Sequence, residues 1–283
     1  MANQVKTVVL LGLLTGVLLW VGNLVGGPTG LTIAIIFAVL MNFFSYWFSD
    51  KIALAVYRAK QITEKDDQRL YRLVREVSGL AKVQMPRVYV IPSSFSNAFA
   101  CGRSEKHAAV AFSEGILKLL NDSELKGVIA HEIAHIKNKD ILISSIAATI
   151  AGVISYVATM AQWAAIFGGF GRERNGPNFI ELLALIIITP LIAALIQFAI
   201  SRSREYIADA SGASYVHSGL GLASALEKLE ADIAKKPLAP HAAVESTAHL
   251  FIVNPFRKGG FVNLLSTHPP MSERIKRLRA MRP

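Results

Sequence analysis

The stretch NDSELKGVIAHEIAH, residues 121–135, joins a helix start to a closely spaced pair of histidines. Asn121 or Asp122 can cap the first turn, and Glu124 can complete a capping box by reaching back to the cap residue. The sequence therefore predicts a helix that begins near residue 122, contains residues 131–135 and runs on toward the apolar stretch that follows.

Within this helix, His131 and His135 are four residues apart, so their side chains share one face. Two imidazoles at that spacing can bind one zinc ion at about 2.0–2.1 Å each. Glu132, one position on, is placed to take a proton from an attacking water and to pass it to a leaving amine. The pattern predicts a hydrolytic zinc site; the alternative is a pair of solvated histidines on a surface helix.

A third ligand must come from elsewhere, because catalytic zinc usually has three protein ligands. Glu205, in the sequence EYIAD at 205–209, is the strongest candidate, and Asp209 lies one turn later on the same face. Asp209 is therefore expected to hydrogen-bond a ligand imidazole. Glu205 could instead pair with Arg202 or Arg204. The histidines that compete for the third position are His107, His217, His241, His249 and His268.

Three long stretches contain no Asp, Glu, Lys or Arg: residues 7–49, 141–171 and 182–201. A bilayer core about 30 Å thick is crossed by roughly 20 apolar helical residues. We therefore expect four membrane helices, at about residues 8–25, 31–48, 141–167 and 179–201. Glycine and proline at 26–30 break the first pair. The alternatives are a cleaved signal peptide for the first helix and buried core helices for the last two.

Lys and Arg are concentrated in residues 50–140 and 202–283, which the positive-inside rule places in the cytoplasm. Arg172 and Arg174, between the last two spans, argue weakly against this orientation. The net charge of +10 fits an anionic membrane surface better than nucleic acid, because no nucleic-acid recognition motif accompanies it. The predicted order is two membrane helices (1–49), the first part of a catalytic domain (50–140), two further membrane helices (141–201) and its second part (202–283).

The catalytic domain is predicted to be mainly helical with a small β-sheet, an α+β arrangement. The runs that are rich in β-forming residues are 88–91, 98–101 and 107–112. An amphipathic helix is expected over 62–80, capped by Thr63 and ended by Gly79. Further helices are expected over 202–215, 220–234 and 272–279. Cys101, the one cysteine, is interpreted as a small apolar strand residue, with a thiolate nucleophile as the minority interpretation.

Both halves of the predicted site flank membrane segments. At a rise of about 1.5 Å per residue, Glu205 lies about 6 Å beyond the fourth span, and His135 lies a similar distance before the third. The site is therefore expected at the cytoplasmic membrane surface, where substrates are cut in segments that emerge from the bilayer.

Several motifs together resemble the HtpX family of membrane-embedded zinc metalloproteases, relatives of the CAAX prenyl endoproteases. They are the paired amino-terminal spans, SNAFA at 96–100, HEIAH at 131–135, EYIAD at 205–209 and STHPP at 266–270. The likeness covers nearly the whole chain in the expected order. It implies a gluzincin-type domain with one zinc ion per chain, in which His131, His135 and Glu205 are ligands and Glu132 is the base. His268 is kept as a catalytic residue that stabilises the transition state.

The resemblance also implies a biological role. An active-site edge strand, formed by Asn97, Ala98, Phe99 and Ala100, would bind extended peptides by backbone pairing. Misfolded or damaged membrane proteins would be the substrates, in quality control and stress response at the inner cell membrane. One alternative is a prenyl-protein processing protease, against which the four spans argue. The other is a non-catalytic zinc-containing membrane chaperone or scaffold, against which the intact Glu132 argues.

Overall fold

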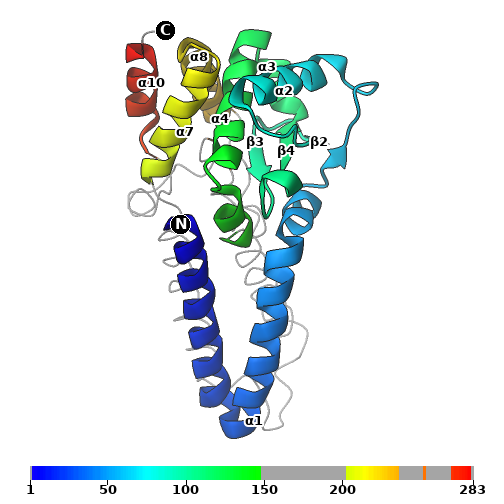
Figure 1. Ribbon diagram of the computed structural model, residues 1–283, viewed down its shortest axis with the longest axis vertical. Coiled ribbons are helices and arrows are strands. Elements are labelled where there is room, and N and C mark those ends of the chain that lie inside the picture. Colours follow the sequence, from blue (N-terminus) through cyan, green and yellow to red (C-terminus); the bar gives the residue numbers. More distant parts are fainter. Residues whose placement is uncertain (1, 148–201, 236–250, 253–268, 282–283) are drawn as a thin grey trace.

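The computed structural model describes residues 2–147, 202–235, 251–252 and 269–281 (Figure 1). A long helical hairpin lies at one end of the molecule, and a mostly helical domain with a small mixed sheet lies at the other. Most of the third predicted span and the whole of the fourth lie outside the described residues, so the prediction of four spans stays a prediction.

The hairpin is α1 (Ala2–Val56), whose two arms meet at Gly27. Gly27 has φ 55° and ψ −141°, a combination that residues with a side chain avoid, and Pro28 follows it. Asn42 Nδ2 donates a hydrogen bond of 2.9 Å to Thr15 Oγ1 and so joins the two arms. The break predicted at residues 26–30 is confirmed.

The second arm, Gly27–Val56, is 30 residues long and is the one helix in the described ranges that is long and apolar enough to cross a bilayer. Its apolar side chains point outward: Ile33 is 62% exposed and Val39 is 63% exposed. A long helix with so much apolar surface on its outside indicates contact with lipid.

The sheet contains four short strands in the order β1-β2-β4-β3. They are β1 (Lys60–Gln61), β2 (Arg87–Ile91), β3 (Ala98–Cys101) and β4 (Ala109–Ser113). β2 and β4 are parallel, and the other two pairs are antiparallel. The three predicted strands are present, although His107 lies in a 3-10 turn (Glu105–His107) rather than in a strand. β1 was not predicted, because two residues carry no pattern.

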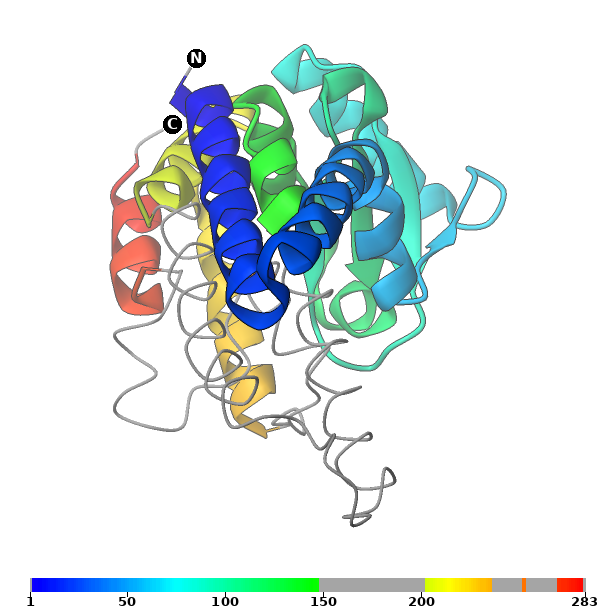
Figure 2. The same ribbon diagram turned by 90° about the horizontal axis from the view of Figure 1, so that it is seen from below.

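The helices of this domain are α2 (Gln68–Ala81), α3 (Glu114–Leu119), α4 (Asp122–Lys137), α7 (Arg202–Tyr215), α8 (Leu220–Lys235) and α10 (Met271–Ala280). Figures 1 and 2 show α4 in the middle, with the sheet and α2 on one side and α7, α8 and α10 on the other. Val128, Ile129 and Ile133 of α4 are completely buried in the core.

Two helix boundaries differ from the prediction. The cap of α2 lies four residues later than predicted, because the Asp67 side chain accepts from Leu70 N at 2.9 Å, whereas Thr63 forms a turn with Asp66. Its end is Ala81 rather than Gly79. In α4 the capping box of Asn121 and Glu124 is present as predicted. That helix ends at Lys137, and residues 141–147 form a separate helix.

Candidate metal centre

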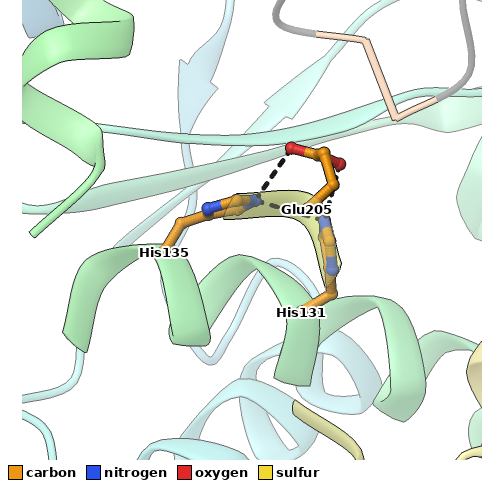
Figure 3. A group of neighbouring side chains, drawn as sticks. All are labelled: His131, His135 and Glu205. Atoms are coloured by element: carbon orange, nitrogen blue, oxygen red, sulfur yellow. Dashed lines mark hydrogen bonds and ion pairs between the residues drawn. The ribbon is translucent and has the colours of Figure 1, made fainter. Parts of the chain in front are cut away.

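Three side chains converge where α7 crosses α4 (Figure 3). The two Nε2 atoms of His131 and His135 are 3.2 Å apart. Glu205 Oε2 lies 3.6 Å from His131 Nε2, and Oε1 lies 3.6 Å from His135 Nε2. All three residues offer a ligand atom within 4.8 Å of the others, as the sequence predicted.

The spacing of these atoms fits a metal ion. Ligand atoms at about 2.0–2.1 Å from a tetrahedral ion lie about 3.3–3.4 Å from one another, close to the three distances above. Two imidazole nitrogens and one carboxylate oxygen suit zinc and related transition metals. A three-residue set also leaves one coordination position open for chemistry.

Gly212 allows α7 to approach α4 at this point. A Cβ atom at Gly212 would lie only 2.9 Å from the carbonyl carbon of Ala130 and 2.9 Å from the backbone nitrogen of His131. Glu205 precedes Gly212 by about two helical turns and therefore lies on the same face of α7. The glycine thus holds the Glu205 side of α7 against the histidines.

Each histidine is oriented by a carboxylate behind it. Asp209 Oδ1 lies 2.9 Å from His131 Nδ1, in the position predicted for it, and Asp140 Oδ2 lies 3.2 Å from His135 Nδ1. With Nδ1 facing a carboxylate, Nε2 faces the centre. Burial lowers the pKa of His131. Burial also opposes protonation of His135, but the hydrogen bond to Asp140 and nearby carboxylates raise its pKa to about 9.

Sequence reasoning missed Asp140 and Arg274. The sequence could have indicated Asp140 as part of the site, since it is an acidic residue just after the end of the histidine-bearing helix. Nothing in the sequence distinguishes Arg274, because it is one of several basic residues in a helix that resembles a solvated one. It is nevertheless completely buried.

The Arg274 guanidinium binds the acidic side of the centre. Nε and Nη2 donate to Asp209 at 2.8 and 2.7 Å, and Nη1 lies 3.3 Å from Glu205 Oε2. One buried cation therefore faces both carboxylates of α7 and links α10 to the histidine cluster. Paired charges of this kind offset part of the cost of burying each of them.

Glu132 lies beside the cluster and is 3% exposed. Burial raises its pKa to about 7, although the charge of His135 and the backbone N–H of Ala100 pull it down. A carboxyl group with such a pKa can both accept and return a proton near neutral pH.

The remaining predicted residues are distributed as follows. Asn97 directly precedes β3, which contains the other three residues of the predicted edge strand and is outermost in the sheet as described here. His107 and His217 are exposed and do not join the cluster. Cys101 is buried, and burial raises its thiol pKa, so the thiolate interpretation is wrong. Three histidines lie outside the described residues: His241, His249 and His268.

Comparison with known proteins identifies the family. The model of peptidase family M48 matches residues 64–282, most of the chain. The chain belongs to peptidase family M48. A relative from Syntrophobacter fumaroxidans, named protease HtpX homolog, is 52% identical over 285 residues, covering 99% of this chain and 100% of the relative. A relative of the same name from Pyrococcus furiosus is 49% identical over 275 residues, covering 97% and 94%.

A solved structure shares the fold. The crystal structure of S. mikatae Ste24p is 18% identical, with a TM-score of 0.51 over 98% of this chain, which spans 65% of that protein. M48 membership and full-length HtpX relatives, together with the apolar helix and the cluster, make this protein a membrane-bound metalloprotease. The predicted resemblance and enzyme class are confirmed.

Proposed function

We propose that this M48 protease is a zinc endopeptidase in which His131, His135 and Glu205 bind one zinc ion and Glu132 is the base. The observation that carries the assignment is the convergence of two Nε2 atoms and one carboxylate at 3.2–3.6 Å. Each imidazole has a carboxylate behind it that fixes its orientation.

The residues of the chain divide the work of hydrolysis. When bound, zinc acts as a Lewis acid on a carbonyl and makes water more acidic. Glu132 accepts the proton of the attacking water and returns it to the leaving amine, which its buried position and raised pKa favour. Asp209 and Asp140 hold the imidazoles, and Arg274 holds Asp209 and Glu205. His268 is proposed to donate a hydrogen bond to the developing oxyanion.

We further propose a multi-pass protein in the inner membrane with its centre at the cytoplasmic surface. Charge-free residues 7–49, 141–171 and 182–201 support several spans. Lysine and arginine in residues 50–140 and 202–283 support the orientation. The helix over 141–147, directly after Asp140, supports a centre close to the membrane. Residues 50–140 and 202–283 together form the proposed catalytic domain.

The proposed substrates are misfolded or damaged membrane proteins, bound as extended peptides along the edge strand of residues 97–100. Backbone pairing requires little of the side chains, so an edge strand suits a protease with many substrates. Processing of prenylated proteins is the alternative. Comparing cleavage of a prenylated peptide with cleavage of an unfolded membrane protein separates the two.

The test uses metal analysis and a casein cleavage assay on purified variants. Glu132→Gln is expected to keep one zinc ion per chain and to lose activity by about 10²-fold or more, because the general base is removed. His135→Ala and Glu205→Ala are expected to lose zinc as well. Glu227→Gln, an exposed change on α8, is the matched control and retains both. Full activity of Glu132→Gln, or activity that survives a chelator, would refute the assignment.

A further inference from the structure

The outer edge of β3 carries a defined set of backbone groups. Ser113 N donates to Asn97 O at 2.9 Å, so these two residues form a hydrogen-bonded pair at the start of the β3–β4 ladder. Such pairs alternate with non-hydrogen-bonded pairs in an antiparallel ladder. Ala98 and Ala100 therefore direct their N–H and C=O groups away from β4. In agreement, the N–H of Ala100 faces the Glu132 carboxylate.

β3 runs alongside the end of α1, in the opposite direction. The Arg103 guanidinium, just after β3, lies 4.6 Å from the ring of Trp47, and the ring of Phe99 lies 5.3 Å from that of Tyr57. Trp47 to Tyr57 is about 15 Å along a helix, and Phe99 to Arg103 is about 13 Å along a strand. The two lengths agree, so the strand lies roughly parallel to the helix axis.

Two independent contacts join the carboxyl end of β3 to the two segments that enter the membrane in the proposed topology. Tyr46 and Trp47 precede Lys51 near the end of the apolar helix, an order typical of a membrane–water interface. On the other side, Gly102 N donates to Ser145 Oγ at 3.0 Å, and Ser145 lies in the helix that opens the charge-free stretch 141–171. In the proposed topology, the strand thus points from the catalytic centre toward the bilayer.

We propose that this geometry selects the polarity of the substrate: the enzyme cuts chains whose membrane anchor lies on the amino-terminal side of the scissile bond. A substrate strand antiparallel to β3 enters at the membrane end near Arg103 and runs away from the bilayer toward Asn97. Antiparallel pairing is the more stable kind per residue, and Ala98 offers both of its outward groups to a single substrate residue. The inference rests on the proposed function and names its substrate class.

The same geometry sets the distance of the cut from the membrane. From Arg103 to the stretch between Ala100 and Ala98 is about 10–17 Å of extended chain. The first cut is therefore expected about three to five residues beyond the interface. Ala98 is 0% exposed and Ala100 is 6% exposed, so pairing with a substrate requires their outward backbone groups to become accessible.

The experiment uses the full-length enzyme with zinc in proteoliposomes and three substrates that share one unstructured tag. In the first, the tag follows a membrane helix; in the second, it precedes the same helix; the third is the free tag. Both anchored tags are placed on the side of the catalytic centre. Initial rates are measured by gel, cut sites are determined by mass spectrometry, and Glu132→Gln enzyme gives the background.

The tag that follows the helix is expected to be cut at least about tenfold faster than the tag that precedes it, with the first cut close to the membrane. A flexible spacer of about 20 residues between helix and tag should reduce this preference toward unity, because the tag can then turn around. Equal rates without the spacer, or faster cutting of the preceding tag, would overturn the polarity while leaving the protease assignment intact. Failure to cut any of the three, the free tag included, would overturn the proposed function and the polarity together.

Discussion

α1 and α4 are both rich in apolar residues, yet they place them in opposite surroundings. In the second arm of α1, Ile33 and Val39 are more than half exposed, whereas Val128 and Ile129 of α4 are completely buried. These α1 side chains face outward from the protein, and the α4 side chains meet other side chains. Apolar composition therefore reports a water-free environment without saying whether lipid or protein provides it.

The polar residues of the two helices sharpen the contrast. Between the arms of the α1 hairpin, a neutral hydrogen bond runs from Asn42 to Thr15. α4 buries His131 and Glu132, which are 1% and 3% exposed. Buried ionisable groups require partners, and His131 finds its partner on α7, where Asp209 is bound in turn by Arg274 of α10. A helix inside the protein can carry chemistry because its neighbours compensate the charges.

The largest loss of stability should follow from removing the buried cation that compensates these charges. Arg274→Met leaves Asp209 and Glu205 without their shared cation, and we expect a loss of about 3–5 kcal/mol of stability together with weaker zinc binding. Thermal unfolding in detergent measures the stability, and metal analysis measures the zinc content. The control is Arg279→Met on the same helix, α10. It breaks an exposed pair with Glu227 of α8 and should change stability and zinc binding little. Unchanged stability of the Arg274 variant would show that the cluster does not depend on α10.

A matched pair of truncations tests the two environments directly. Ile129→Ala opens a cavity in the packed core and should cost about 2–5 kcal/mol. Ile33→Ala removes a group that faces lipid, which closes over the gap, and should cost about 1 kcal/mol or less. Thermal unfolding in lipid nanodiscs measures both. Equal losses would mean that Ile33 is packed against protein rather than lipid.

A smaller loss of stability is expected from a substitution at the point where α7 closely approaches α4. Gly212→Ala places a methyl group 2.9 Å from backbone atoms of Ala130 and His131, and we expect a loss of about 1–3 kcal/mol with lower activity. Gly79→Ala on α2 is the control, since its methyl group meets nothing within 4 Å and should be neutral or stabilising. If both variants behave alike in unfolding and casein assays, the close approach is not what positions Glu205.

The parts of the fold that could be predicted from sequence have local signals. The capping box of Asn121 and Glu124 marks the start of α4, and the four-residue spacing of His131 and His135 marks its functional face. The break at Gly27 is visible because glycine and proline interrupt a charge-free stretch. Each of these signals is contained within a few residues, so it can be recognised without knowledge of the tertiary contacts.

The features that were missed depend on contacts between distant residues. Thr63 and Asp67 are both good helix caps, and the sequence alone does not say which one accepts the backbone N–H of the first turn. Arg274 differs from the basic residues beside it only because Asp209 and Glu205 surround it, and those come from another helix. The two residues of β1 form a strand because β2 pairs with them. Such information is absent from any short window of sequence.

The contact between Arg274 and the histidine centre has a consequence for synthesis of the protein. Arg274 is made 143 residues after His131, so α4 leaves the ribosome well before the helix that neutralises the acidic side of its site. Until α10 docks, the nascent chain holds histidines and carboxylates without the buried guanidinium. The centre therefore gains its buried cation only after α10 has been synthesised and has packed against α7.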